Sequence, residues 1–126
     1  MSGAYGPRML EHARNPRNRG RLDAPSVSQD GTNMSCGDRM RIELDIDGDV
    51  ITDARFTAKA CSICVASASA LTELVRGAPF DDVATLTVGE LAAQLGTDIR
   101  PSRLPCVSLP LTVLHAAIVL YRRQRG

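Results

Sequence analysis

The chain has 126 residues, of which 44% are hydrophobic and 3% aromatic, and its formal net charge is +1. A chain of this length and composition can bury a core without disulfide bonds, so we expect residues 1–126 to form a single globular domain. The weak net charge and the few aromatic side chains argue against binding to nucleic acid.

The sequence also bears on location and on the use of its cysteines. No apolar run approaches the roughly 18 residues of a membrane span, and Met1–Arg21 has no apolar stretch of the signal-peptide type. We therefore expect no membrane insertion and a cytoplasmic location. Four cysteines in such a chain suit metal or sulfur chemistry better than a disulfide framework.

The first predicted elements are one short helix and two strands. The helix spans Tyr5–Ala13 and ends before Pro16, because proline disfavours a helical residue in front of it. Residues Arg21–Ser35 are interpreted as mostly loop. Apolar and polar residues then alternate over Arg39–Asp47 and again over Val50–Lys59, which is typical of half-buried strands.

The two strands are predicted to form a hairpin. A three-residue turn, Asp47–Asp49, keeps the apolar faces of both strands on one side. The resulting register pairs Ile46 with Val50, Leu44 with Thr52, Ile42 with Ala54, Met40 with Phe56, Asp38 with Ala58 and Cys36 with Ala60. Paired residues have Cβ atoms about 5 Å apart. Cys36, Asp38 and Cys61 are therefore expected to converge at one end of the hairpin.

The rest of the chain is predicted to be helical. The expected helices span Ser62–Arg76, Phe80–Ala84, Val88–Leu95 and Pro110–Arg123. Thr87 is placed to cap the third of them, and Pro110 suits the first turn of the last. Arg100–Pro105 is interpreted as extended or looped. Strands followed by helices predict an α+β, two-layer domain, with a small antiparallel sheet of about three strands packed against several helices.

Each cysteine has a structural and a chemical interpretation. Cys36 and Asp38 are separated by a glycine, which lets a thiolate and a carboxylate face one centre. Cys61 precedes a helix, and the unpaired N–H groups of a helix start favour a nucleophile or a metal ligand. Cys64 continues the apolar stripe of that helix, so packing alone explains it. Cys106 is expected in a loop that can fold over the end of the hairpin.

The residues alone leave several functions open. Cys61 and Cys64 have the Cys-x-x-Cys spacing of redox dithiols, which suggests a dithiol oxidoreductase. Three thiolates and one carboxylate also satisfy tetrahedral zinc, which suggests a zinc-stabilised interaction domain. His12 is interpreted as a surface or packing residue, and His115 as a satisfied structural residue.

Five motifs narrow this choice when they are taken together. They are His12–Gly20, Cys36-Gly37-Asp38, Asp53–Phe56, Cys61 leading into Ala66–Ser69, and Cys106. Their order and spacing resemble the NifU-like family, which includes the IscU and SufU proteins, over nearly the whole chain. The resemblance implies an iron–sulfur cluster assembly scaffold and sulfur acceptor, rather than an enzyme in its own right.

The resemblance also implies a cofactor, a site and partners. The cofactor is a transient [2Fe–2S] cluster or Zn²⁺, and the matching ligand positions are Cys36, Asp38, Cys61 and Cys106, with Cys64 as a substitute thiol. Soft thiolates suit iron or zinc, and a harder carboxylate eases release of a cluster. Cys106 matches the position of a first persulfide acceptor. The implied partners are a cysteine desulfurase and recipient apo iron–sulfur proteins or carriers.

Two segments depart from the IscU branch. Pro105 stands where that branch has a histidine, and Ile99–Arg103 stands where it has a Leu-Pro-Pro-Val-Lys segment read by an Hsp70-type chaperone. Hand-off to such a chaperone is therefore not implied. Pro101–Arg103 and Cys61–Ile63 look more like the SufU branch, but the insertion typical of that branch between the second and third cysteines is absent.

Overall fold

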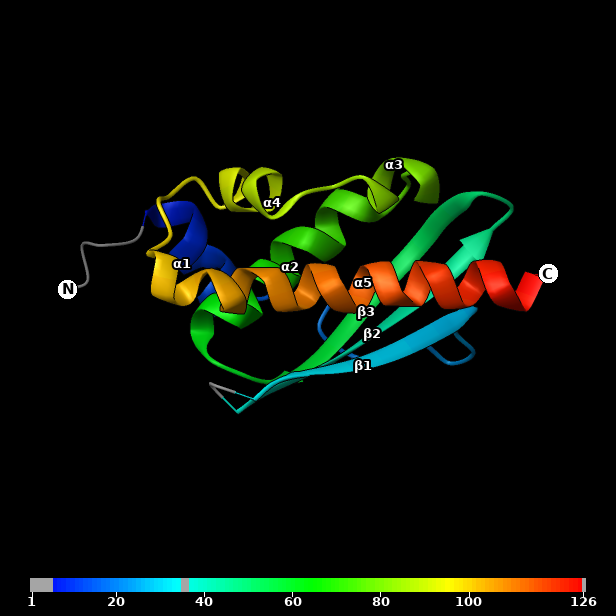
Figure 1. Ribbon diagram of the computed structural model, residues 1–126, viewed down its shortest axis with the longest axis horizontal. Helices are drawn as coiled ribbons and strands as arrows, with labels where there is room; N and C mark the ends of the chain where they lie inside the picture. Colours follow the sequence, from blue (N-terminus) through cyan, green and yellow to red (C-terminus); the bar gives the residue numbers. More distant parts are fainter. Residues whose placement is uncertain (1–5, 35–36, 126) are drawn as a thin grey trace.

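The chain folds as an antiparallel sheet with helices packed on one of its faces (Figure 1). The structure is a computed structural model that describes residues 6–34 and 37–125. Within these residues there are three strands, β1 (Val27–Asn33), β2 (Asp38–Asp47) and β3 (Val50–Lys59), in the order β1-β2-β3. The helices are α1 (Pro7–Arg14), α2 (Ser62–Val75), α3 (Phe80–Ala84), α4 (Val88–Gln94), the 3-10 turn η2 (Pro101–Arg103) and α5 (Leu104–Arg125). The predicted α+β class is confirmed.

The prediction of a loop over Arg21–Ser35 is wrong in part, because this segment contains β1. The strand pairs with β2 from Val27, opposite Leu44, to Asn33, opposite Asp38. Val27 is the only apolar residue in β1, so the strand carries no apolar alternation. Pairing with β2 and packing under α5, rather than its own pattern, hold this segment in an extended conformation.

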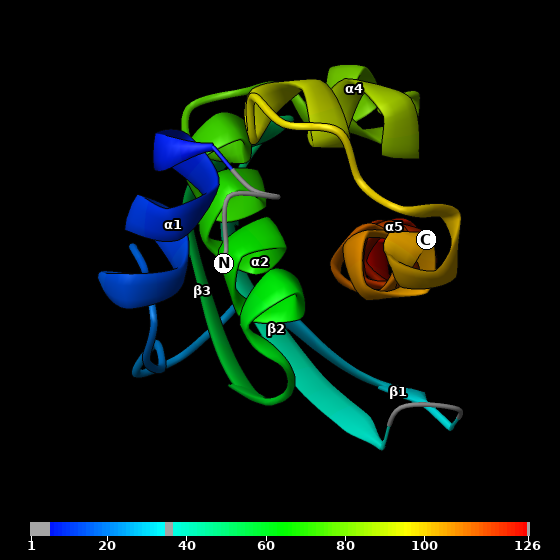
Figure 2. The same cartoon turned by 90° about the vertical axis from the view of Figure 1, so that its left-hand side faces the viewer.

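The contact between β1 and α5 depends on a glycine. A Cβ atom built on Gly31 would lie 2.4 Å from Cγ2 of Val113 and 3.4 Å from Cδ1 of Leu109. The first distance is far below van der Waals contact, so any side chain at position 31 would push α5 away from the sheet. Figure 2 shows α5 end-on, next to α2, with the sheet beneath both helices.

The predicted hairpin has the right strands but the wrong register. Gly48 and Asp49 alone separate the paired residues Asp47 and Val50, and a bulge leaves Thr52 as an extra residue on β3. Beyond the bulge, each residue of β2 faces a partner two residues further along β3 than predicted, so that Leu44 pairs with Ala54, Ile42 with Phe56 and Met40 with Ala58. A shift of two residues preserves the faces, because side chains alternate with a period of two. The bulge does change the face of the first residues, since Ile51 is fully buried and Val50 is 36% exposed.

The last helix begins earlier than predicted. It starts at Leu104 rather than Pro110, so the segment Arg100–Pro105 forms η2 and the beginning of α5 instead of a loop. Pro110 therefore lies inside the helix, where its ring nitrogen has no hydrogen to donate to the carbonyl of Cys106, four residues earlier. The helix continues through this position because its buried residues pack on the sheet and on α2.

The expectation that no apolar run approaches the length of a membrane span is also wrong, because one helix meets the criteria of length and composition. The helical stretch Pro101–Arg125 is long and apolar enough to cross a membrane. Half of its most apolar part is buried inside the domain, however, which is typical of a central core helix. In this structure α5 packs on β1, β2 and α2.

A buried carboxylate ties the segment before β1 to the outer face of the sheet. Glu43, which alternation alone places on a solvent-facing side, is 2% exposed. Its Oε1 accepts a hydrogen bond from the backbone N–H of Leu22 (2.7 Å), and its Oε2 accepts one from Nε of Arg41 (2.9 Å). Burial alone would raise the pKa of Glu43, but these donors and the nearby Arg21 outweigh it, so the pKa lies below its ordinary value.

The first prediction concerns this carboxylate. Replacing Glu43 by Gln should lower the free energy of unfolding by about 1–3 kcal/mol, because a neutral amide at this buried position bonds the two donors less strongly. The exposed Asp47, on the same strand, provides the control, and Asp47→Asn should change stability by at most about 0.5 kcal/mol. Urea unfolding followed by circular dichroism measures both. Equal effects of the two variants would contradict the assignment of Glu43 as a structural clamp.

Candidate metal centre

Three potential metal ligands converge where two helices and one strand begin. Asp38 is the first residue of β2, Cys61 is the N-cap residue of α2, and Cys106 lies in the first turn of α5. Both helices begin at the same end of the domain (Figure 1). The two sulfur atoms and one carboxylate oxygen all lie within 4.8 Å of one another. The fold therefore gathers two thiols and a carboxylate from distant parts of the chain.

The contacts within this group give the two oxygens of Asp38 different roles. The backbone N–H of Cys61 donates to Oδ1 of Asp38 at 3.1 Å. The other oxygen, Oδ2, lies 3.8 Å from Sγ of Cys106, and that sulfur lies 3.4 Å from Sγ of Cys61. One oxygen thus anchors the start of α2 to the start of β2. The second oxygen faces the thiols.

The spacing of these atoms fits a single tetrahedral metal ion. With metal–sulfur bonds of about 2.3 Å and metal–oxygen bonds of about 2.0–2.2 Å, neighbouring ligand atoms lie roughly 3.6–3.8 Å apart. The sulfur–sulfur distance of 3.4 Å and the sulfur–oxygen distance of 3.8 Å lie close to these values. Thiolates favour zinc and iron, so the donor set suits either metal.

Of the three potential ligands that the structure describes, Cys61 is the most accessible to solvent. Cys106 is fully buried and Asp38 is 3% exposed, whereas Cys61 is only partly buried. Arg39 and Lys59, both exposed, form the last pair of the β2–β3 ladder next to the centre, and Lys59 is the only lysine of the chain. Two positive charges therefore lie at the same end of the domain as the thiols.

The residues predicted for this site have different outcomes. The structure brings Asp38, Cys61 and Cys106 together, with Cys106 supplied by a helical turn rather than by the predicted loop. Cys36 lies outside the described residues. Cys64 is fully buried one turn along α2 and does not belong to this group of described side chains, in agreement with its interpretation as a core thiol.

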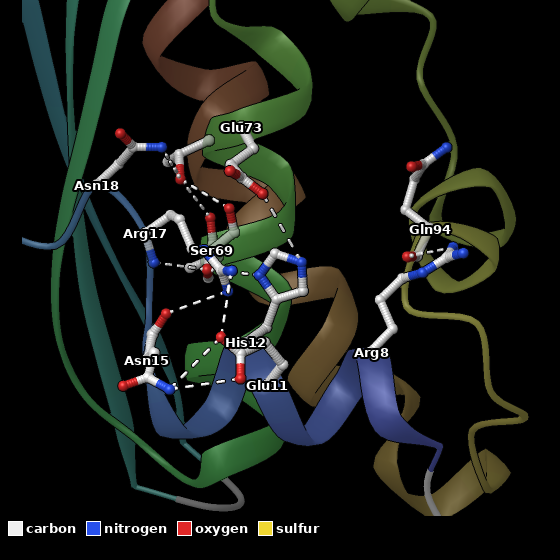
Figure 3. Close-up of polar contacts among 11 residues, drawn as sticks. Arg8, Glu11, His12, Asn15, Arg17, Asn18, Ser69, Glu73 and Gln94 are labelled. Atoms are coloured by element: carbon white, nitrogen blue, oxygen red, sulfur yellow. Dashed lines mark hydrogen bonds and ion pairs between the residues drawn. The ribbon is translucent and has the colours of Figure 1, made fainter.

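A second polar group links α1 to the middle of α2 (Figure 3). Nδ1 of His12 lies 2.7 Å from Oγ of Ser69, and this oxygen accepts a hydrogen bond from the backbone N–H of Arg17 at 2.8 Å. On the other side of the ring, Nε2 lies 3.9 Å from Oε1 of Glu73. Asn18 contacts α2 as well, because its side-chain amide donates a hydrogen bond to Oγ1 of Thr72. These contacts fix the segment after α1 on the surface of α2.

His12 is buried, so of its two predicted roles the packing role is the correct one. A neutral ring with its proton on Nε2 satisfies both neighbours, because Nδ1 then accepts from Ser69 and Nε2 faces Glu73. Burial lowers the pKa of His12, which Glu73 opposes and Arg17 reinforces. Ser69, its main partner, was not predicted. The sequence signal for it is its place in Ala66–Ser69, one of the motifs named above, in which alanine and serine alternate. His115 is satisfied as predicted, with Nε2 3.0 Å from the carbonyl oxygen of Val83.

Comparison with known proteins places the whole chain in one group. Residues 4–126 match the family described as NifU-like N terminal domain. The chain is 40% identical, over its full length and 81% of the relative, to the iron–sulfur cluster assembly scaffold protein IscU of Aquifex aeolicus. It is 35% identical to the bifunctional protein NifU/MnmA of Rubrobacter xylanophilus, of whose length it spans 26%. It is 30% identical to the zinc-dependent sulfurtransferase SufU of Bacillus subtilis, with 90% of this chain and 88% of that protein covered.

The fold is shared with solved structures as well. The crystal structure of a NifU-like protein (N-terminal) from Brucella abortus superposes with a TM-score of 0.81 and covers 96% of each chain. Only 21% of the residues are identical, so this similarity concerns the fold.

The second prediction concerns the pH dependence of stability. The unfolded chain takes up a proton at His12 near its ordinary pKa of 6.5, whereas the folded chain resists it. The stabilisation is therefore complete above pH 6.5 and is lost as the pH falls through that value toward the lower pKa of the folded state. Urea unfolding at pH 7.5 and pH 5.5 should show a larger loss for the wild type than for His12→Gln. Equal losses would contradict the assignment of a neutral ring.

Proposed function

Because this chain belongs to the family of NifU-like N-terminal domains, we propose that it is an assembly scaffold for iron–sulfur clusters, working in the cytoplasm as a single domain over residues 1–126. The observation that carries the proposal is the convergence of Asp38, Cys61 and Cys106, whose ligand atoms lie within 4.8 Å of one another. Two thiols and a carboxylate at one end of a rigid fold can hold iron or zinc.

The cargo is a transient [2Fe–2S] cluster, and Zn²⁺ is the alternative occupant of the same ligands. Cys36 is proposed as the fourth ligand, together with Asp38, Cys61 and Cys106. The mixed donor set supports transient binding of the cluster, because a carboxylate binds a cluster less tightly than a thiolate does. Oδ2 of Asp38 is the proposed ligand atom, because it faces Sγ of Cys106 while Oδ1 accepts the N–H of Cys61. Cys64, fully buried in the core, is a substitute only if α2 rearranges.

The proposed partners are a cysteine desulfurase, which supplies sulfur, and apo iron–sulfur proteins or carriers, which receive the cluster. Cys106 is the proposed persulfide acceptor. The protein then assists the chemistry of others rather than catalysing a reaction of its own. The printed names of two relatives, a cluster assembly scaffold and a zinc-dependent sulfurtransferase, support this pairing of roles.

The two other functions left open by the sequence are not favoured. A dithiol oxidoreductase of this kind would pair Cys61 with Cys64, whereas Sγ of Cys61 lies 3.4 Å from Sγ of Cys106 and Cys64 is fully buried in the core. A zinc-stabilised interaction domain explains the ligands but not the kinship with proteins named for cluster assembly and sulfur transfer.

The third prediction separates the metal ligands from the core thiol. Replacing Cys61 or Cys106 by Ser should weaken zinc binding at least about tenfold, because even groups that only orient metal ligands contribute that much. Cys64→Ser is the matched control and should bind zinc like the wild type. Competition with a chromophoric chelator gives the affinities, and circular dichroism verifies the fold. A loss of affinity in Cys64→Ser alone would contradict the proposed ligand set.

The fourth prediction concerns cluster assembly. Incubation of the apo-protein with a cysteine desulfurase, cysteine and ferrous iron, without oxygen, should produce the visible absorbance of a [2Fe–2S] cluster. Cys106→Ser should form none, because it lacks both a ligand and the sulfur acceptor. Absence of cluster absorbance in the wild type, with all its cysteines intact, would count against the scaffold function. Stimulation of the desulfurase by zinc-loaded protein, without cluster formation, would favour zinc-dependent sulfur transfer.

A further inference from the structure

The two described thiols of the centre lie in direct contact. Sγ of Cys61 is 3.4 Å from Sγ of Cys106, and the hydrogen-bond chain runs from the Cys61 thiol to the Cys106 sulfur and from the Cys106 thiol to Oδ2 of Asp38. Reacting atoms held about 3–3.5 Å apart are close to the geometry of attack. The spacing that suits a shared metal ion is thus also short enough for one sulfur to attack the other.

Resting on the proposed role of Cys106 as sulfur acceptor, we propose that Cys61 discharges the persulfide of Cys106 and releases its outer sulfur as sulfide. The thiolate of Cys61 attacks Sγ of Cys106, a new sulfur–sulfur bond forms between the two side chains, and the bond from Sγ to the outer sulfur breaks. The outer sulfur leaves with the electron pair as hydrosulfide. The Cys61 sulfur is oxidised from thiolate to disulfide and the outer sulfur is reduced to sulfide, while the Cys106 sulfur keeps its oxidation level, so the electrons balance without an external reductant.

The geometry favours this direction of attack over transfer of the sulfur to Cys61. Which product forms depends on which sulfur of the persulfide is attacked, and a poorly basic leaving group departs faster. Cys61 already contacts Sγ of Cys106, the inner sulfur, and hydrosulfide is a good leaving group. Attack at the inner sulfur therefore follows from the contact between the two thiols.

Burial gives an internal thiol an advantage over external ones. Cys106 is fully buried, whereas Cys61 is partly exposed, so small thiols from solution have poorer access to Cys106 than Cys61, which already contacts it. Loading of Cys106 requires the first turn of α5 to move. Pro110 eases that movement, because it removes one helical hydrogen bond between this turn and the rest of the helix. Once the turn returns, the persulfide lies beside Cys61.

The anchoring of Cys61 supports the same assignment. Its backbone N–H is held by Oδ1 of Asp38 at 3.1 Å, and its carbonyl accepts the N–H of Val65 in the first turn of α2. The attacking sulfur therefore belongs to a fixed N-cap residue, while the attacked sulfur belongs to a turn that can move. After each discharge a dithiol reductant, of the thioredoxin type, is needed to open the disulfide and restore the two thiols.

The test follows one discharge in the full chain after metal removal. Reduced protein is loaded briefly with inorganic polysulfide without oxygen, desalted at once, and followed by intact-mass spectrometry, peptide mapping and a sulfide assay. The wild type should lose the added sulfur, release an equimolar amount of sulfide, and end two hydrogens lighter with a disulfide between Cys61 and Cys106. Cys61→Ser should keep the sulfur on Cys106, with loss at least about tenfold slower because the internal attacking group is absent. Cys61→Ala repeats the test with a second side chain, and Cys64→Ser should match the wild type.

Several results would overturn the proposal. One is an added sulfur that persists in the wild type, and another is equally fast discharge in Cys61→Ser. A disulfide between Cys106 and either Cys36 or Cys64 would show that Cys61 is not the attacking thiol. A Cys61→Ser variant that gains no sulfur on Cys106 would show that Cys106 is not the acceptor. Loading with a desulfurase and cysteine keeps the two hypotheses apart. Failure of that donor alone counts against the proposed function, whereas slow discharge after polysulfide loading counts against this inference.

Discussion

The arrangement of this domain depends on how closely α5 approaches β1. Gly31 allows Val113 to lie against the strand backbone, at a position where a Cβ atom would be only 2.4 Å from the nearest methyl group. A long helix held that tightly at Val113 has little freedom to slide or tilt as a whole, so this contact sets where its first turn rests, two helical turns earlier. Cys106 is placed beside Cys61 in this way. The site is therefore built by core packing as much as by local geometry.

Two acidic residues of β2 show how surroundings separate a structural carboxylate from a chemical one. Glu43 and Asp38 are both nearly inaccessible to solvent. Oε1 of Glu43 accepts the backbone N–H of Leu22, in the segment before β1, and Oε2 accepts Nε–H of Arg41 on the same strand, so both oxygens are occupied by structural hydrogen bonds. In Asp38, Oδ1 accepts the backbone N–H of Cys61, whereas Oδ2 faces the thiol of Cys106. A carboxylate with such a divided role can bind a metal without leaving its neighbours unsatisfied.

Much of this arrangement could be predicted, and the failures have physical causes. Apolar alternation identified β2 and β3, and the register was wrong by two residues because a bulge at Thr52 has no signature in the pattern. The error preserved the face of every residue beyond the bulge, so Asp38 still came out near Cys61. β1 escaped prediction because only Val27 is apolar, and its extended conformation depends on pairing and on α5. The helical position of Cys106 was missed because Pro110 is a signal for a helix start, and tertiary packing outweighed it.

The order of elements along the chain adds a consequence for biosynthesis. Asp38 and Cys61 are joined by hairpin and helix contacts between neighbouring segments, whereas Cys106 enters through α5, which packs on β1, the first strand of the sheet. A ribosome releases the chain from its N-terminus onward, and segments fold as they emerge. The half-site with Asp38 and Cys61 can thus form during translation, but the second thiol joins it only after α5 has emerged. Synthesis of nearly the whole domain therefore precedes completion of the centre.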